Sequence, residues 1–226
     1  MPPLPLKFDA QGLVPVIVQD HLTGEVRMFA FATAEAIRAT LETGRATFWS
    51  RSRSELWEKG LTSGNTIRVL RVLADCDADC VIYSAEPEGP SCHTGALSCF
   101  FQVLEGAGAA AGLAQAAEQP QTLLATLEGT LEARKQSTGA SSYTKSLYDA
   151  GAPKIGAKLR EEAGELAQAL EGESDDRVAS EAADVLYHLM VGLRWRAIPF
   201  RRVLVDLAKR FGKSGHAEKA SRAPVA

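Results

Sequence analysis

All four cysteines of the chain lie in one short stretch, between residues 76 and 99. Cys76 and Cys80 stand among alternating aspartates, and Cys92 and Cys99 frame the segment His-Thr-Gly-Ala-Leu-Ser. Thiolates from two short segments are typical zinc ligands, and carboxylates are typical magnesium ligands. Three thiolates would leave a tetrahedral position open for water, as in a catalytic zinc site, whereas Cys80 as a fourth ligand would close it. The stretch predicts hydrolytic metal chemistry, with a structural zinc site beside an acidic loop as the alternative.

Three aspartates, Asp75, Asp77 and Asp79, alternate along the first cysteine segment. If this segment is extended, the alternation places the three carboxylates on one face and Cys76 on the other. Like charges repel unless a cation neutralises them, so we expect magnesium here. His93 lies between two candidate zinc ligands, where it could bind zinc or move a proton to or from a zinc-bound water. A hydrogen-bonded bystander is the alternative role for His93.

A second group of carboxylates lies on two predicted helices of the C-terminal half. Glu162 and Glu165 are three positions apart on one helix, and Glu181 and Asp184 are three apart on the next. Residues at this spacing share a helix face, so two antiparallel helices could gather four carboxylates around one or two Mg²⁺ ions. A solvated acidic face is the alternative. Against it, Glu181 and Asp184 border an apolar stripe.

A polar segment upstream of the cysteines is suited to phosphate binding. Arginines, hydroxyls and turn glycines are dense from Trp49 to Arg53 and again from Trp57 to Asn65. Guanidinium groups and exposed N–H groups bind phosphate oxygens, and Trp49 or Trp57 could stack on a base. A polar loop with two core tryptophans is the alternative.

The elements that must position these residues differ between the two halves. Short runs of Val, Ile and aromatic residues predict strands at 13–18, 26–31, 46–50, 67–73, 80–84 and 99–104, with one helix between Thr33 and Gly44. Apolar residues at helical spacing predict a helical second half, divided near Gly172 and Pro199. Residues 106–119, rich in Ala and Gly, predict a flexible linker between domains 1–105 and 120–226.

Composition and charge limit the function classes. The chain has 226 residues, is 46% hydrophobic and carries a formal net charge of −3, as is ordinary for a soluble protein. We expect no membrane span and read no secretory signal, so the cysteines favour metal binding over disulfides and the cytoplasm is the expected location. Residues 194–226 carry nine Lys/Arg against two Asp/Glu. This basic end is either solvated or receives phosphates; without aromatics after Phe211 we do not expect nucleic-acid binding.

Several motifs of the first half resemble phosphoribosyl-AMP cyclohydrolase of histidine biosynthesis. They cover residues 8–104 and are, in order, Gly12–Asp20, Trp49–Ser52, Leu56–Gly60, Thr62–Gly64, Asp75–Asp79, Cys92–Gly95 and Ser98–Phe100. The resemblance implies zinc on Cys76, Cys92 and Cys99, magnesium on Asp75, Asp77 and Asp79, and a homodimer that shares the zinc ligands between subunits. Cys80 lies outside this pattern.

The same resemblance carries further site residues. We expect His93 to be catalytic and phosphoribosyl nucleotide to contact Trp49, Ser50, Arg51, Ser52, Lys59, Ser63 and Thr94. The chain departs from the family pattern at Asn65, where many members have histidine.

The acidic helices resemble the all-α pyrophosphohydrolases, which include phosphoribosyl-ATP pyrophosphohydrolase and the MazG-like enzymes. The resemblance covers residues 120–213 and rests on Glu161–Glu165, Glu181–Asp184, Ser142–Thr144 and Asp184–His188. It implies a MazG-like helical bundle with Mg²⁺ on Glu162, Glu165, Glu181 and Asp184 and with a substrate contact from Lys158. The chain departs from the pattern at Ala157 and Arg160.

Together the two resemblances imply a bifunctional hydrolase of histidine biosynthesis, with a mostly-β α+β metal-binding domain before an all-α domain. The C-terminal domain would release pyrophosphate from phosphoribosyl-ATP, and the N-terminal domain would then open the adenine ring by zinc-dependent hydrolysis. One rival is a nucleotide-detoxifying pyrophosphohydrolase fused to a zinc deaminase-like domain, although the chain has no Pro-Cys-x-x-Cys segment. The other rival is a zinc-stabilised binding module without catalysis.

Overall fold

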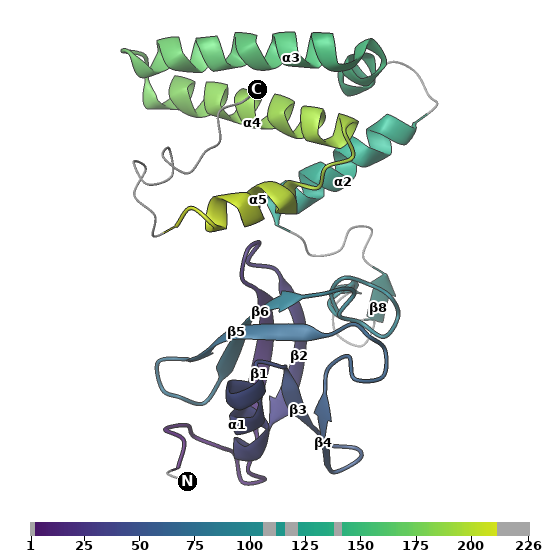
Figure 1. Ribbon diagram of the computed structural model, residues 1–226, viewed down its shortest axis with the longest axis vertical. Helices are drawn as coiled ribbons and strands as arrows, with labels where there is room; N and C mark the ends of the chain where they lie inside the picture. The colour runs from purple at the N-terminus through teal and green to yellow at the C-terminus, as the bar shows by residue number, and fades with distance from the viewer. Residues whose placement is uncertain (1–2, 106–111, 116–121, 138–141, 212–226) are drawn as a thin grey trace, which may run out of the picture. The chain divides into compact units, whose positions relative to one another are not determined.

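The computed structural model describes residues 3–105, 112–115, 122–137 and 142–211. The chain divides into two compact units, residues 1–122 and residues 123–226. The first unit is rich in strands and the second is helical, which confirms the predicted class of each half (Figure 1). Among the described residues, no helix is both long enough and apolar enough to cross a membrane.

A six-stranded sheet is the frame of the first unit. In the order β4-β3-β2-β1-β6-β5 it contains β1 (Val14–Asp20), β2 (Val26–Ala32), β3 (Thr47–Ser50), β4 (Glu55–Glu58), β5 (Ile67–Ala74) and β6 (Val81–Pro87). β1 and β6 are parallel, with Val16 opposite Val81, and all other neighbours are antiparallel. Along β1, buried and half-buried residues alternate because successive side chains point to opposite faces of a sheet.

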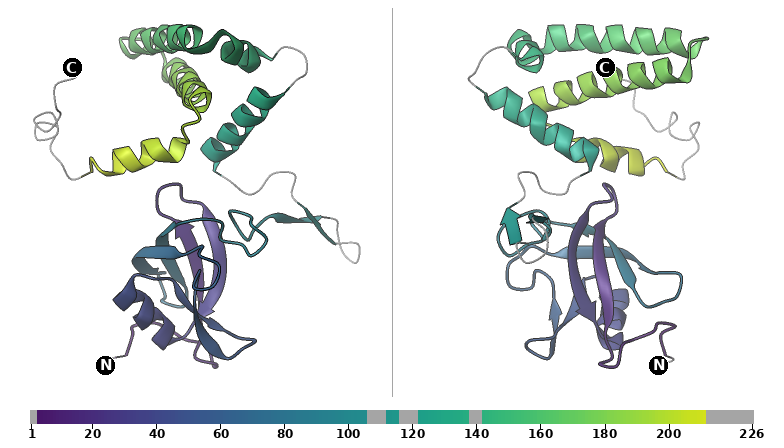
Figure 2. Two further views of the ribbon diagram at one scale, coloured as in Figure 1. Left: turned by 45° about the vertical axis from the view of Figure 1, so that its right-hand side comes forward. Right: turned by 180° about the vertical axis from the view of Figure 1, so that it is seen from behind.

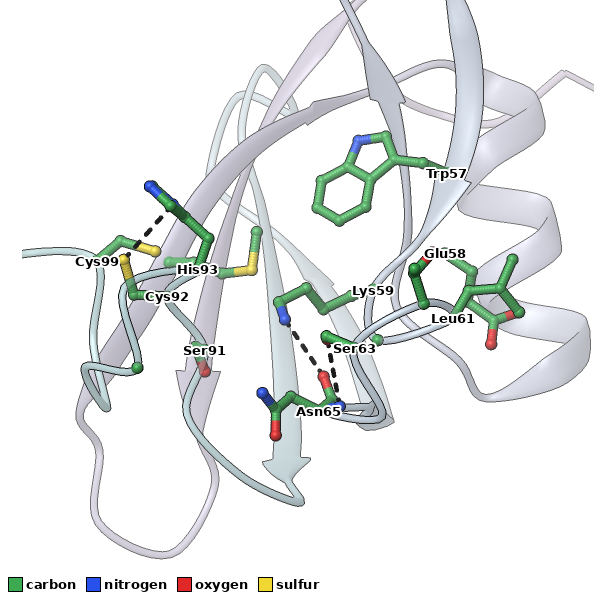
Figure 3. Close-up of a pocket in the computed structure, with 14 residues that line it drawn as sticks. Trp57, Glu58, Lys59, Leu61, Ser63, Asn65, Ser91, Cys92, His93 and Cys99 are labelled. Carbon is green, nitrogen blue, oxygen red and sulfur yellow. Dashed lines mark hydrogen bonds between the residues drawn. The ribbon is translucent and has the colours of Figure 1, made fainter.

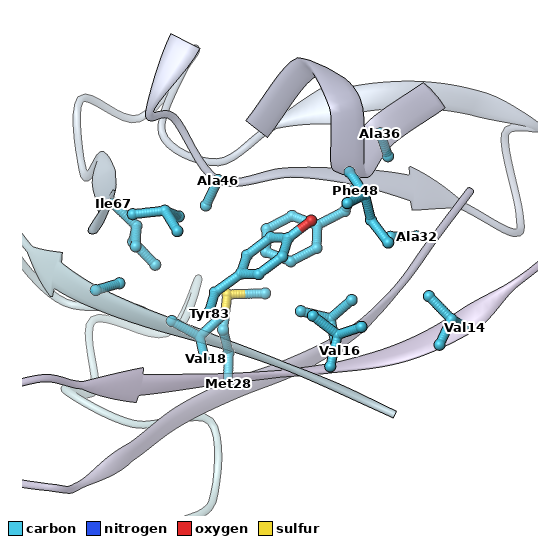
Figure 4. Close-up of a cluster of buried hydrophobic side chains, with 14 residues drawn as sticks. Val14, Val16, Val18, Met28, Ala32, Ala36, Ala46, Phe48, Ile67 and Tyr83 are labelled. Carbon is cyan, nitrogen blue, oxygen red and sulfur yellow. The ribbon is translucent and has the colours of Figure 1, made fainter. Parts of the chain in front are cut away.

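The core of this unit includes side chains from the sheet and from helix α1 (Ala34–Thr43). The rings of Phe48 and Tyr83 lie at its centre, with their centroids 5.6 Å apart (Figure 4). The Tyr83 hydroxyl donates a hydrogen bond to the Thr47 carbonyl, 3.3 Å away, and lies 3.2 Å from the Thr40 hydroxyl. Burial raises the pKa of Tyr83 to about 12. These partners matter because a buried hydroxyl without them would cost stability.

A separate pair of antiparallel strands, β7 (Gln102–Glu105) and β8 (Gly112–Gln115), follows the sheet (Figure 2). β8 lies within residues 106–119, so the structure differs there from the expected linker. Alanine and glycine do not prevent this pairing, because a strand ladder uses backbone N–H and C=O groups. The rest of the expected linker lies outside the described residues.

Four helices form the described part of the second unit: α2 (Leu123–Gln136), α3 (Tyr143–Leu170), α4 (Asp175–Trp195) and α5 (Phe200–Ala208). α3 and α4 lie side by side (Figure 2). The Ser174 hydroxyl caps α4 by accepting a hydrogen bond from the Arg177 N–H at 3.3 Å. The apolar core joins α2, α3 and α4 through Leu131, Leu147, Tyr148, Ile155, Met190 and Val191.

Helix α3 is interrupted by Gly151, whose backbone has φ 69° and ψ −166°. Residues other than glycine rarely adopt this conformation, so we expect Gly151→Ala to lower the free energy of unfolding by about 1–3 kcal/mol. Gly129→Ala in α2 is the matched control, because a Cβ there meets nothing within 4 Å and alanine favours a helix. Urea unfolding followed by circular dichroism compares them. Equal stability of the two variants would contradict the assigned strain.

Candidate active sites

A pocket of about 470 Å³ opens in the first unit beside the cysteine loop. Its wall combines the chain around β4 with the loop between β6 and β7 (Figure 3). The polar and thiol residues that line it include Lys59, Ser63, Asn65, Ser91, Cys92, His93 and Cys99. The structure therefore brings the second cysteine segment next to the predicted phosphate-binding residues Lys59 and Ser63.

Cys92 and Cys99 form a thiol pair at this pocket. Burial raises the pKa of Cys99 to about 11, and the neighbouring Cys92 adds to that rise. For Cys92, burial alone would raise the pKa, but hydrogen bonds from Thr94, Cys99 and the backbone outweigh it and lower the pKa. The Thr94 hydroxyl lies 3.2 Å from the Cys92 Sγ atom, and His93 Nδ1 lies 3.9 Å from it. The two thiols thus differ, since the pKa of Cys92 is lowered and that of Cys99 is raised.

Cys76 is not part of this thiol pair. It is exposed in the turn between β5 and β6. Among the described residues, the groups of three or more potential metal ligands that lie within 4.8 Å of one another are two carboxylate groups, and neither includes a cysteine. One chain therefore places two of the three predicted zinc ligands together and the third elsewhere.

The aspartates next to Cys76 form the first of these carboxylate groups, Asp75, Asp77 and Asp79. Their segment is a turn and not an extended strand, so the condition under which alternation alone would place the three carboxylates on one face is not met. The Asp75 carboxylate accepts hydrogen bonds from the N–H groups of Asp79 at 3.0 Å and Cys80 at 3.1 Å. These bonds lower the pKa of Asp75, whereas the charge of Asp77 raises the pKa of Asp79. Turn geometry, rather than strand alternation, gathers the charges.

Lys59 enters the pocket from a closed turn. Its ammonium donates a hydrogen bond to the Asn65 carbonyl at 3.2 Å, and burial lowers its pKa. Gly60, with φ 88°, permits the turn, because a Cβ at this position would lie 2.5 Å from the Asn65 backbone. The chain thus holds a partly desolvated cation beside the thiol pair.

Five of the seven substrate contacts predicted in the first unit lie outside this pocket. Trp49 and Ser50 end β3, and Arg51 and Ser52 lie in the turn after it, where the Arg51 guanidinium covers the Phe31 ring at 4.1 Å. Thr94 does not line the pocket but contacts Cys92, whose Sγ atom lies 3.2 Å from the Thr94 hydroxyl. Trp57 does line the pocket, as do Met28 and Glu58. Met28 and Glu58 were not among the predicted site residues, because a methionine in a strand indicates a core position and a glutamate indicates a surface position.

Three of the four predicted ligands on the acidic helices, Glu162, Glu165 and Glu181, come within 4.8 Å of one another. Glu162 and Glu181 are only 7% and 2% exposed, so a solvated acidic face does not describe them. Burial raises the pKa of Glu181, and the charges of Glu165, Asp184 and Glu162 raise it further against the effect of Arg177. Asp184 is exposed and lies outside this group, although its charge acts on Glu181.

Positive side chains partly compensate the buried carboxylates. Lys158 lies 2.9 Å from Glu162 and 2.8 Å from Glu161, which raises the pKa of Lys158, and Arg177 lies 2.6 Å from Glu181. The second oxygen of Glu181, Oε2, is buried without a hydrogen-bond partner in the described part of the chain. A buried carboxylate oxygen without a partner is costly, and a cation would remove that cost.

A buried histidine that was not among the predicted site residues supports the same cluster. His188 Nδ1 lies 2.9 Å from the Asp184 carbonyl and 3.8 Å from Glu162 Oε1, and Nε2 lies 2.9 Å from the Tyr143 hydroxyl. A carbonyl can only accept, so Nδ1 carries the proton. His188 lies on α4 and thus contacts α3 at two places, at Tyr143 near its start and at Glu162 in its acidic segment.

The two units match two different family models. Residues 28–101 match the model of phosphoribosyl-AMP cyclohydrolase, and residues 124–211 match the model of phosphoribosyl-ATP pyrophosphohydrolase. The chain thus carries, in this order, the two domain types that its motifs indicated.

Whole-chain comparisons agree. The histidine biosynthesis bifunctional protein HisIE of Aquifex aeolicus is 41% identical over 92% of this chain and 99% of its own length. That of Caldanaerobacter subterraneus subsp. tengcongensis is 38% identical over 92% and 97%. The chloroplastic protein of Arabidopsis thaliana is 41% identical over 96% of this chain and 79% of its own length. The chain belongs to this family of bifunctional histidine-biosynthesis enzymes, with phosphoribosyl-AMP cyclohydrolase and phosphoribosyl-ATP diphosphatase activities. Because the chain belongs to this family, the two rival readings, a deaminase-like enzyme and a binding module without catalysis, are not supported.

Proposed function

We propose that the helical domain releases pyrophosphate from phosphoribosyl-ATP and that the strand-rich domain then opens the adenine ring of the resulting phosphoribosyl-AMP. The single observation that best supports this division is the buried, unpartnered Glu181 oxygen among three carboxylates. Such a group is suited to a hard cation that holds phosphates. The thiol pair of the other domain is suited instead to zinc.

For ring opening, zinc would be held by Cys92 and Cys99 together with Cys76 of a second copy of the chain. The separation of Cys76 from the thiol pair within one chain supports this homodimer. Zinc bound by three thiolates lowers the pKa of a water in its fourth position toward about 7. Magnesium would be held by Asp75, Asp77 and Asp79, whose gathered charges call for a cation.

The residues of the first pocket would bind and orient the nucleotide. The Lys59 ammonium can pair with a phosphate oxygen, and the Trp57 ring offers a face for the base. His93, beside the Cys92 thiol, would exchange a proton through a ring nitrogen. Trp49, Ser50, Arg51, Ser52 and Thr94 remain proposed contacts, but none of them lines this pocket.

For pyrophosphate release, Mg²⁺ would be held by Glu162, Glu165 and Glu181, with Asp184 as a fourth ligand. Magnesium neutralises and orients a triphosphate when it is bound there. Lys158 is ion-paired to both Glu161 and Glu162, so a cation that takes the Glu162 carboxylate leaves the ammonium with the exposed Glu161 alone and able to bind a phosphate oxygen. This exchange couples metal binding to phosphate binding.

Selective metal loading of the full chain tests the division of labour. With Mg²⁺ but no zinc, we expect phosphoribosyl-ATP to give phosphoribosyl-AMP and pyrophosphate in equal amounts. Added zinc should then convert phosphoribosyl-AMP to the ring-opened product without release of ammonia. Chromatography and a pyrophosphate assay follow both steps. Pyrophosphate release that requires zinc, or ammonia formed with the product, would overturn the proposal.

A further inference from the structure

The loop that carries the thiol pair has no regular secondary structure of its own. It runs from the end of β6 at Pro87 to the start of β7 at Gln102 and includes Cys92 and Cys99. Metal ligands on a loop must be held by neighbouring groups if their separation is to stay constant. The contacts at the two ends of this loop therefore decide how the thiols are placed.

The C-terminal end of the loop is held by the backbone of β2. The Cys99 N–H donates a hydrogen bond to the Arg27 carbonyl at 2.9 Å, and the Ser98 hydroxyl donates to the Val26 carbonyl at 2.8 Å. In the described part of the chain, β2 pairs with β3 at Phe31, away from these two residues. The loop thus contacts the β2 backbone at Val26 and Arg27.

The N-terminal end of the loop is held by the side chain of Arg27. Its guanidinium donates hydrogen bonds to the Gly89 carbonyl at 3.2 Å and to the Ser91 hydroxyl at 3.4 Å. Its side chain is only 8% exposed, and its ion pair with Glu25 spans 3.5 Å. Burial of a guanidinium lowers stability unless its N–H groups form hydrogen bonds or ion pairs.

We propose that Arg27 is a positioning residue that fixes the spacing of Cys92 and Cys99, and so the affinity of their site for zinc. One residue reaches both ends of the loop, with its side chain on Ser91, which precedes Cys92 in the chain, and its carbonyl on the Cys99 N–H. The inference rests on the proposed zinc site. Loss of the guanidinium releases only the Gly89–Ser91 end, because the backbone bond to Cys99 remains.

Zinc affinity of the full chain tests this role without any measurement of turnover. We expect Arg27→Met, which keeps the apolar stem, to weaken zinc binding by about 10- to 100-fold in competition with a chromophoric chelator. Ser91→Ala removes a single acceptor and should weaken it severalfold. Arg68→Met is the matched control, since Arg68 forms an ion pair with Glu86 on the surface and should leave zinc affinity unchanged.

The outcomes distinguish failure of the Arg27 role from failure of the proposed zinc site. If the unaltered chain binds no zinc, the proposed zinc site is wrong. If the unaltered chain binds zinc and Arg27→Met binds it within twofold as tightly, Arg27 has no positioning role. Urea unfolding followed by circular dichroism reports whether the strand-rich unit is folded in each variant, and Ser91→Ala decides the matter if Arg27→Met fails to fold. Unchanged zinc affinity in Ser91→Ala would then overturn the inference.

Discussion

Serine in place of Cys92 or Cys99 is expected to abolish ring opening while pyrophosphate release stays near the unaltered rate. Both thiols lie at the first-unit pocket, and serine is a poor ligand for zinc. The carboxylate cluster belongs to the other compact unit, so its chemistry should continue. Phosphoribosyl-AMP should therefore accumulate from phosphoribosyl-ATP, which chromatography of the reaction mixture measures directly.

Cys80→Ser is the control for this experiment. Cys80 is a half-buried thiol outside the pocket, so its replacement should keep both zinc and ring opening. Zinc lost in this variant would show that the ligand set is misassigned. Loss of both activities in a folded Cys92→Ser protein would show that the two sites do not act separately.

A second large effect is expected from Glu181→Gln and Glu165→Gln, which each remove one charge from the helical cluster at nearly constant volume. Because we expect metal binding to need these charges, pyrophosphate release should fall by about two orders of magnitude or more. Ring opening of supplied phosphoribosyl-AMP should not change. Metal-free Glu181→Gln should be at least as stable as the unaltered chain, because the raised pKa of Glu181 shows that its charged form is disfavoured there.

Glu171→Gln provides the comparison for these variants. Glu171 caps the C-terminal end of α3, is exposed and lies outside the carboxylate group. Its rate and stability should remain close to those of the unaltered chain. A near-normal rate of pyrophosphate release in both Glu165→Gln and Glu181→Gln would refute the proposed magnesium site.

The sequence predicted the regular elements well where the local signal is strong. Thr33 and Gly44 bound α1 as expected, and runs such as Val14–Asp20 alternate toward a single core. β4 was missed because Glu55–Glu58 has charges at both ends and its burial comes from its neighbour β3. β8 was missed because alanine and glycine signal flexibility, whereas its pairing with β7 depends on a partner strand.

The site was predictable in its ligand types but not in its geometry. Helical spacing places Glu162 with Glu165, and the contact of α3 with α4 adds Glu181. For Asp75 to Asp79, alternation suggested one extended face, whereas hydrogen bonds to the Asp75 carboxylate fold a turn. The position of Trp57 in the pocket and the contacts of Arg27 with the loop after β6 both depend on which strands are neighbours in the sheet. Hydrophobic periodicity does not reveal that strand order.

The parallel pairing of β1 with β6 has a consequence for the order of folding. Val16 meets Val81, so the central sheet cannot close until most of the first unit has been synthesised. Helices α3 and α4 are successive in the chain and contact each other after a short turn. Folding rates fall as contacts become more distant in sequence. The unit that leaves the ribosome first is therefore expected to complete its core more slowly, and β1 keeps an unpaired edge until β6 has been made.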